Sequence, residues 1–444
     1  MTTPANNKKS TENATVPVVR NLLWMGWSGS MGIANSVVLW IFIARMRDVE
    51  EMGRFTIVMG LYALFYNICS LGLVPFHVNE ISRRNGRKDF STPDNKRAIT
   101  DYISSATILS LISGTVCAVL MAAGGFMVSS SWSVRIAALI LSFAIIPTSL
   151  ISVAEAAAVS FGRTRLIAFV STLENVLRTI IPFALIWFGF DISVVCLSFV
   201  TVRLTALIPY LWVTRRKITD FCFNAADFGK ILRVSPTFSG TIILSSINWQ
   251  LPIILLGFLS TEIESAKYGV ASRFLIPVSI LMASFADVIH PLIVRYMADS
   301  AAKAGAYILK MLSYPLILST AAAIAAPFLS YRVLTILFGA AYADASATLN
   351  IMAISVIPFC VVMIVARGLV AANSQHIDLL ANAFAVVACI IGGWFLIPRY
   401  GGIGAAAAQL LSLLVMALTA GGYLSRKIVN FRFRQKAAVS SSVF

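Results

Sequence analysis

Two long apolar stretches lie close together near the end of the chain. Residues 377–398 read IDLLANAFAVVACIIGGWFLIP, and residues 402–424 read GIGAAAAQLLSLLVMALTAGGYL. Asp378 is the only charged residue in either stretch. Each is long enough for an α-helix to cross a hydrocarbon core of ~30 Å, which takes ~20 residues. The pair therefore predicts two membrane-spanning helices joined by a very short loop that contains Arg399.

Stretches of the same kind recur along the whole chain of 444 residues, of which 58% are hydrophobic and 12% charged. A soluble domain carries roughly a quarter of its residues as charged ones. The other apolar stretches lie at about 22–44, 55–76, 102–126, 132–155, 166–188, 192–213, 236–259, 268–294, 306–329 and 347–371. The first is too long for a cleavable signal segment. The sequence thus predicts an all-α integral membrane protein of about twelve transmembrane helices.

The basic residues predict how these helices are oriented. With the amino terminus placed inside, 24 basic residues fall in inner loops and tails and 7 in outer loops. Lysine and arginine collect on the cytoplasmic side of membrane proteins. We therefore expect a multi-pass protein of the cell inner membrane with both termini in the cytoplasm. The net charge of +16 follows from this bias.

The loop lengths predict two halves. The inner loops at 77–101 and 214–235 are the longest, and the second lies between six predicted helices on each side. We expect a disordered cytoplasmic tail (1–20), a first lobe (21–213), a cytoplasmic linker (214–235), a second lobe (236–425) and a basic cytoplasmic tail (426–444). Because six is an even number, a duplicated half keeps its orientation, which predicts a pseudo-twofold axis along the membrane normal.

Several other functions find no support in the sequence. It contains no Gly-rich phosphate loop and no basic run interleaved with stacking aromatics, so nucleotide hydrolysis and nucleic-acid binding are not expected. The three histidines and six cysteines are scattered through the chain, and they predict neither a metal site nor a disulfide framework. No cofactor is expected apart from coupling to a proton or sodium gradient.

Several short pieces, in order and in spacing, resemble the Wzx-like polysaccharide flippases of the multidrug/oligosaccharidyl-lipid/polysaccharide (MOP) exporter superfamily. The resemblance covers nearly the whole chain. The pieces are Ile43-Ala44-Arg45 followed by Glu51-Met52-Gly53-Arg54-Phe55, Asn79-Glu80-Ile81-Ser82-Arg83, Tyr268-Gly269-Val270-Ala271-Ser272-Arg273, Leu337-Phe338-Gly339 with Tyr342, and Ile397-Pro398-Arg399-Tyr400-Gly401-Gly402-Ile403-Gly404-Ala405-Ala406.

The resemblance implies a two-lobed bundle that alternates between inward-open and outward-open forms around a cationic cavity. The implied substrate is an undecaprenyl-diphosphate-linked oligosaccharide, the repeat unit of an O-antigen, capsule or exopolysaccharide. A polysaccharide polymerase or chain-length protein would then be a partner. The same superfamily contains the MATE drug exporters, so a multidrug/ion antiporter is the alternative function.

Charges inside the predicted spans indicate where a substrate could bind, because an ionised side chain at the bilayer centre costs at least ~2.5–3.5 kcal/mol and needs a partner or a wet cavity. Glu174 and Arg178 are four residues apart on one helix face, and Arg203 lies at a similar depth in the next span. Two guanidiniums at one depth would hold a diphosphate, since each binds phosphate oxygens in a bidentate manner. The alternatives are a structural pair of Glu174 with Arg178 and a structural role for Arg203.

Further charged residues are secondary candidates. Arg273 and Asp287 are fourteen residues apart, near one face of a single predicted helix, and His290 follows one turn after Asp287. Asp287 with His290 is an ion-coupling candidate, and the alternative is that Asp287 pairs with a basic residue of another helix. Arg273 and Arg45 are candidate diphosphate ligands, although Arg45 is equally suited to anchor the interface. Glu155 and Arg367 lie near their cytoplasmic helix ends, which favours structural roles.

The charges also separate the competing functions. A MATE-like exporter of cationic drugs needs a cavity dominated by acids, whereas arginines outnumber acids within these spans. A polymerase or ligase would be an enzyme with a large outer loop carrying catalytic groups, and the outer loops here are short. The sequence therefore predicts a transporter without catalytic residues.

Overall fold

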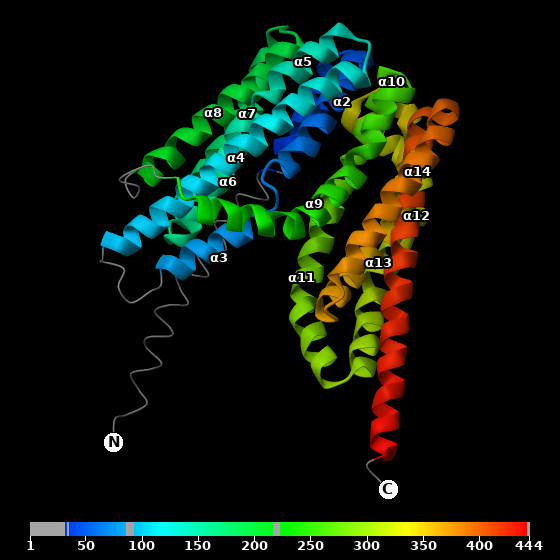
Figure 1. Ribbon diagram of the computed structural model, residues 1–444. Coiled ribbons are helices and arrows are strands. Elements are labelled where there is room, and N and C mark those ends of the chain that lie inside the picture. Colours follow the sequence, from blue (N-terminus) through cyan, green and yellow to red (C-terminus); the bar gives the residue numbers. More distant parts are fainter. Residues whose placement is uncertain (1–31, 33–34, 86–92, 216–222, 442–444) are drawn as a thin grey trace, which may run out of the picture. The chain divides into compact units, whose positions relative to one another are not determined.

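The computed structural model describes the chain except residues 1–31, 33–34, 86–92, 216–222 and 442–444. The described residues form helices and no strand (Figure 1). After the short apolar helix Asn35–Met46, the elements are α2 (Val49–Ile68), α3 (Val74–Asn85), α4 (Pro93–Val128), α5 (Trp132–Ser142), α6 (Ile145–Ser160), α7 (Thr164–Trp187), α8 (Ile192–Arg215), α9 (Ala225–Leu259), α10 (Glu262–Ser272), α11 (Leu275–Asp299), α12 (Ala301–Phe338), the 3₁₀ helix η1 (Ala340–Ala345), α13 (Ser346–Ala371) and α14 (Gln375–Ser441).

The predicted membrane-spanning character is confirmed. Within the described residues, 9 helical stretches are long and apolar enough to cross a membrane. One of them, Gln375–Asn430, contains both of the predicted spans at 377–398 and 402–424, so these nine account for ten predicted spans. Of the other two, 22–44 lies partly outside the described residues, and 55–76 corresponds to α2 and the start of α3.

Three predicted spans are interrupted, and each interruption lies about one turn before a proline. The breaks are at Leu71, at Phe143–Ala144 and at Arg273–Phe274, and Pro75, Pro147 and Pro277 follow. Leu71 also has a positive φ of 49°. A proline ring clashes with the carbonyl four residues earlier and donates no hydrogen bond to it, which favours a break there. The predicted spans 132–155 and 268–294 are therefore kinked within helical stretches long enough to cross a membrane, and 55–76 is divided between α2 and α3.

The described chain forms two compact units. The first contains the described residues of 1–43, 65–123 and 135–239, and the second contains those of 44–64, 124–134 and 240–444. The units are thus not continuous in sequence, because most of α2 belongs with the second and α9 begins in the first. The predicted lobe boundaries at 21–213 and 236–425 stay predictions.

Helix α6 is the centre of the first unit, where it packs against α3, α7 and α8 (Figure 1). Its side chains are mostly small, and Ala154, Ala156, Ala157 and Ala158 are all buried. Helices in a membrane are held together by close packing because lipid tails are as apolar as leucine, and small residues let backbones approach. The composition of α6 therefore suits a central position.

Helix α13 has the same role in the second unit, where it packs against α10, α11, α12 and α14. Gly368 permits the contact with α14, since a Cβ there would lie 2.6 Å from the Leu424 side chain. Ile364 and Leu369 of α13 and Ala385 of α14 are fully buried in the core between these helices. The core of this unit is therefore apolar.

Candidate functional site

A buried ion pair lies at the centre of the first unit. Arg203 of α8 donates from Nη1 to both carboxylate oxygens of Glu174 of α7, at 2.5 and 2.7 Å. Both side chains are nearly inaccessible. The remaining donors of Arg203 reach Thr148 Oγ1 of α6 at 3.0 Å and the Tyr66 hydroxyl at the end of α2 at 2.9 Å. Side chains from three other helices thus converge on one guanidinium, as a buried charge requires.

Arg178 lies beside this pair and is held more loosely. Its Nη1 is 3.5 Å from Glu174 Oε1, and its guanidinium lies 5.3 Å from the centre of the Phe199 ring. The side chain is 27% exposed, against 8% for Arg203. The predicted grouping of Glu174, Arg178 and Arg203 is present in the structure, and Arg178 is the arginine with accessible donors.

The cluster formed by Glu174, Arg178 and Arg203, called here the arginine cluster, contains two guanidiniums and one carboxylate. Glu174 is engaged mainly by Arg203, so the charge of Arg178 is only partly neutralised. Guanidinium groups bind phosphate oxygens through paired hydrogen bonds. The arginine cluster can therefore accept an anion at Arg178 without losing its internal ion pair.

A further acid lies in the same unit. Glu155 of α6 accepts a hydrogen bond from the hydroxyl of Tyr210 of α8 at 3.1 Å. Among the described residues, no cation lies within ion-pair distance of this carboxylate. An ionisable residue in a spanning helix that forms no ion pair is a candidate for function. The sequence position of Glu155, near the end of its helix, by itself favours a structural role.

In the second unit Asp287 has a cationic partner. Its carboxylate lies 2.6 Å from Arg367 of α13, and the Asp287 side chain is 65% exposed. His290 follows one turn later on α11, and its Nδ1 has no hydrogen-bond partner among the described residues. This ion pair matches the alternative interpretation, in which Asp287 pairs with a basic residue of another helix. The spacing in the sequence does not indicate that this residue is Arg367.

The other two candidate arginines contact backbone carbonyls. Arg45 donates to Leu337 O at 2.9 Å and to Ile336 O at the end of α12. Arg273 lies in the break between α10 and α11, where its Nε reaches Gly269 O at 3.4 Å. Arg273 thus lies at the kink that precedes the helix of Asp287, and the shared face of these two residues stays a prediction.

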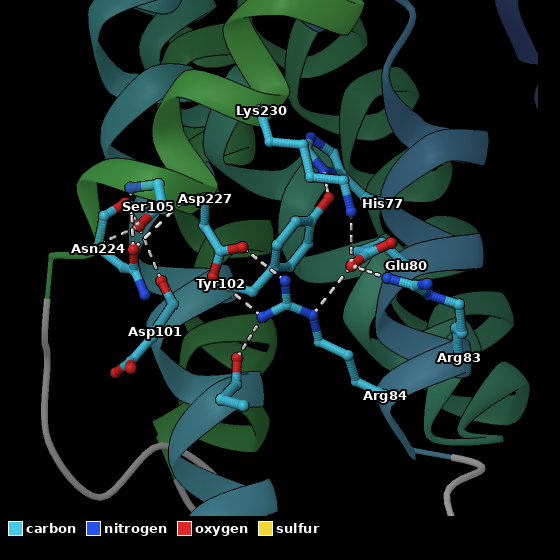
Figure 2. Close-up of polar contacts among 12 residues, drawn as sticks. His77, Glu80, Arg83, Arg84, Asp101, Tyr102, Ser105, Asn224, Asp227 and Lys230 are labelled. Atoms are coloured by element: carbon cyan, nitrogen blue, oxygen red, sulfur yellow. Dashed lines mark hydrogen bonds and ion pairs between the residues drawn. The ribbon is translucent and has the colours of Figure 1, made fainter.

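A second polar network lies on the first unit where α3, α4 and α9 meet (Figure 2). One oxygen of the Glu80 carboxylate, Oε1, is reached by Arg83 at 2.8 Å, Arg84 at 3.1 Å and Lys230 at 3.0 Å. Burial by itself raises the pKa of Glu80, but the hydrogen bonds from these three cations lower it to about 2. The Glu80 carboxylate is therefore ionised at neutral pH.

The buried part of this network contains Arg84, Tyr102 and His77. Arg84 bonds both Asp227 oxygens, at 2.5 and 3.0 Å, and lies over the Tyr102 ring. The Tyr102 hydroxyl is 2.8 Å from His77 Nδ1. Burial lowers the pKa of His77 to about 4, so its imidazole is neutral at neutral pH. The sequence pattern indicates no role for these residues beyond a basic inner loop.

Several residues of these sites were not found from sequence. Tyr66, Thr148 and Phe199 complete the arginine cluster, and Tyr210 binds Glu155. Uncharged polar and aromatic residues are frequent in membrane helices, so their types carry no distinguishing signal. Among the described residues, no group of three His, Cys, Asp or Glu side chains could hold a metal ion.

Comparison with solved structures identifies the fold. A multidrug-resistance MATE family transporter of the MOP superfamily in an inward-facing conformation has a TM-score of 0.71 and 15% identity, covering 90% of this chain and 95% of that one. The lipid II flippase MurJ in an inward closed conformation has a TM-score of 0.70 and 16% identity, covering 92% and 87%. A MOP superfamily transporter from Pyrococcus furiosus, described as having a binding pocket of reverse polarity, has a TM-score of 0.60 and 12% identity, covering 94% and 96%.

The fold is therefore shared with transporters of the MOP superfamily and with a lipid II flippase. The family model described as polysaccharide biosynthesis protein matches residues 18–297. The chain belongs to this family, and the resemblance seen in the sequence is confirmed. No curated protein shows a significant match to the sequence. The chain is thus a multi-pass membrane protein of the polysaccharide biosynthesis family with a MOP transporter fold.

Proposed function

We propose that this chain is a flippase that moves a polyprenyl-diphosphate-linked oligosaccharide across the cell inner membrane by alternating access, with both termini in the cytoplasm. The membership in a polysaccharide biosynthesis family favours a glycan precursor as cargo. The similarity of fold to a lipid II flippase is consistent with a lipid-linked substrate.

The arginine cluster is the observation that carries this proposal. Arg178 combines an accessible guanidinium with an incompletely neutralised charge, and Arg203 keeps Glu174 occupied. An anionic diphosphate gains charge-assisted hydrogen bonds at such a site, whereas a cationic drug meets a net positive charge. We assign Arg178 the direct contact with the phosphate. The ion pair of Arg203 with Glu174 then holds the Arg178 side chain in position. Arg45 and Arg273 remain further candidate ligands.

Ion coupling is proposed at a carboxylate, with Asp287 and His290 as the first candidates. Asp287 is exposed and paired with Arg367, so protonation would release Arg367. Glu155 is the second candidate, because its carboxylate accepts a hydrogen bond from the neutral hydroxyl of Tyr210. A carboxylate that exchanges its proton as the cavity changes sides can link transport to a proton gradient.

The proposal is tested by reconstituting the purified chain in vesicles with a fluorescent sugar on a polyprenyl diphosphate. Translocation is measured by the fraction of label that an impermeant quencher reaches. We expect the chain to accelerate translocation of the diphosphate-linked sugar and not of a neutral polyprenyl glycoside. Equal acceleration of both, or no acceleration, would contradict the proposal.

The second candidate function is a MATE-like antiporter of drugs and ions, since a MATE transporter shares the fold at a TM-score of 0.71. In cells, this function predicts that loss of the chain raises sensitivity to cationic drugs and leaves surface polysaccharide unchanged. The flippase function predicts the reverse, with lipid-linked precursor accumulating on the cytoplasmic leaflet. The phenotype of one deletion strain therefore distinguishes the two functions.

A further inference from the structure

The network around Glu80 places its cations outside and its acids inside. Arg83 and Lys230 are 61% and 42% exposed, whereas Glu80 is 7% exposed. The second acid, Asp227, is 12% exposed and is bonded by Arg84 through two donors. The accessible surface of the network is therefore positive, even though carboxylates lie directly beneath it.

The positive charge of this surface is not fully neutralised from within. Asp227 neutralises Arg84, which leaves Glu80 as the ion-pair partner of both Arg83 and Lys230. Asp101 of α4 lies near Ser105, which bonds the Asp101 carbonyl and Asn224 (Figure 2). No ion pair joins Asp101 to Arg83 or Lys230 among the described residues. One cationic charge is thus left in excess at the exposed pair.

The two exposed cations are held close together by the fold. They come from α3 and α9, which are far apart in sequence, yet both bind the same oxygen of Glu80. Their nitrogens cannot lie farther apart than the sum of those two short distances. Because Glu80 is buried and fixed by three hydrogen bonds, it holds both side chains in place. An Arg and a Lys arranged in this way offer a preformed pair of donors to one anion.

The pair also lies at the level of lipid headgroups. The apolar stretch of α4 begins at about residue 102. Arg84 of the network lies over the ring of Tyr102 and bonds Ala98 O one turn earlier, at 2.6 Å. The network therefore lies at the border of the hydrocarbon core. Basic pockets between transmembrane helices on the charged side of a membrane protein bind the head groups of anionic lipids.

We propose that Arg83 and Lys230 form a binding site for the phosphate of an anionic phospholipid, with Glu80 as the buried group that positions both cations. The phosphate oxygens accept hydrogen bonds from the Arg83 guanidinium and the Lys230 ammonium, while the acyl chains lie along the apolar part of α4. This site is separate from the arginine cluster and does not depend on the proposed transport function. A bound lipid at this position would join α3 to α9.

The test measures lipid binding to the full-length protein purified in a neutral detergent. Fluorescent phosphatidylglycerol is titrated against the chain, with phosphatidylcholine, inorganic diphosphate and farnesyl diphosphate as competitors. Each basic residue near an anionic surface contributes about 1 kcal/mol, so Arg83→Gln and Lys230→Gln should each weaken phosphatidylglycerol binding roughly fivefold. Arg83→Lys should retain most of the affinity. Arg165→Gln, which removes an exposed basic charge outside the network, is the matched control and should leave binding unchanged.

The outcomes separate the alternatives. Equal weakening by Arg165→Gln would overturn the proposal, since binding would then follow net charge alone. Unchanged binding in the double variant Arg83→Gln/Lys230→Gln would also overturn the proposal. Competition by farnesyl diphosphate well below the concentration of phosphatidylglycerol would instead assign the site to the isoprenoid diphosphate and overturn the phospholipid assignment. Thermal unfolding of each variant in detergent, compared with the parent, excludes loss of binding through misfolding.

Discussion

At the scale of single residues, two arginines that look equivalent in the sequence differ in their surroundings. Arg203 has a buried carboxylate, a hydroxyl from threonine and a hydroxyl from tyrosine as partners. Arg178 shares that carboxylate at a longer distance and keeps donors accessible. Removing one partner of a buried pair leaves the other charge uncompensated, which costs roughly 3–5 kcal/mol. The two arginines therefore predict different defects when they are replaced.

For Arg178→Ala we expect normal abundance and a transport rate lowered at least about tenfold, because a charge-assisted contact to phosphate contributes roughly 1.5–3 kcal/mol. Arg178→Lys should restore transport only in part, since an ammonium lacks the bidentate fork. For Arg203→Ala we expect a large loss of folded protein. Abundance is measured by size-exclusion chromatography, and transport by the quencher assay in vesicles. Full transport in Arg178→Ala would disprove the phosphate contact.

The coupling carboxylate is identified by comparing two conservative variants. If Asp287 carries the driving proton, Asp287→Asn abolishes the dependence of transport on a pH gradient while the protein remains folded. If Glu155 carries it, Glu155→Gln has this effect instead. The measurement is the rate of translocation in vesicles with and without an imposed pH gradient. Gradient dependence retained in both variants would assign coupling to another group or to sodium.

At the scale of elements, the long helix α14 contains one kink that the sequence marks by glycines. Gly401 has φ 53° and ψ −126°, which interrupts the helix between its two spanning parts. The Glu264 carboxylate of α10 accepts the Gly402 N–H at 2.8 Å and binds Lys267 at 2.9 Å. A residue with a side chain is strained at positive φ, and a Cβ at Gly401 would lie 2.4 Å from Glu264 Oε2.

Gly401→Ala should therefore destabilise the protein by roughly 1–3 kcal/mol, the cost of strained backbone. The expected result is a lower midpoint of thermal unfolding in detergent. Gly422→Ala is the matched control on the same helix, because nothing lies within 4 Å of a Cβ there. An equal midpoint for Gly401→Ala and the parent would show that α14 tolerates a regular helix at this point.

At the scale of the whole molecule, the distribution of basic residues predicts the orientation. In a variant without native cysteines, cysteines introduced at Gly86 and Thr219 should be protected from an impermeant thiol reagent added outside intact cells, because the positive-inside rule assigns both loops to the cytoplasm. A cysteine at Ser131 should be labelled. Labelling at the first two positions and protection at Ser131 would reverse the proposed topology.

The sequence by itself determined the membrane-spanning class of this protein, because length and hydrophobicity are local properties that need no partner. It also indicated the family, through pieces such as Tyr268-Gly269-Val270 and the run around Gly401. It further predicted that Glu174, Arg178 and Arg203 lie at a similar depth in the membrane. Only the tertiary structure decided which carboxylate neutralises which arginine. The pairs Arg203 with Glu174, Asp287 with Arg367 and Lys230 with Glu80 each join different helices. Such pairs depend on how helices rotate and pack, and packing is set by the shape of all the contacting side chains.

The prolines at 75, 147 and 277 were visible in the sequence, but the many prolines that lie inside continuous helices, such as Pro182 and Pro358, look the same there. Whether a proline breaks its helix depends on whether neighbouring helices satisfy the freed carbonyls, which only the folded chain decides.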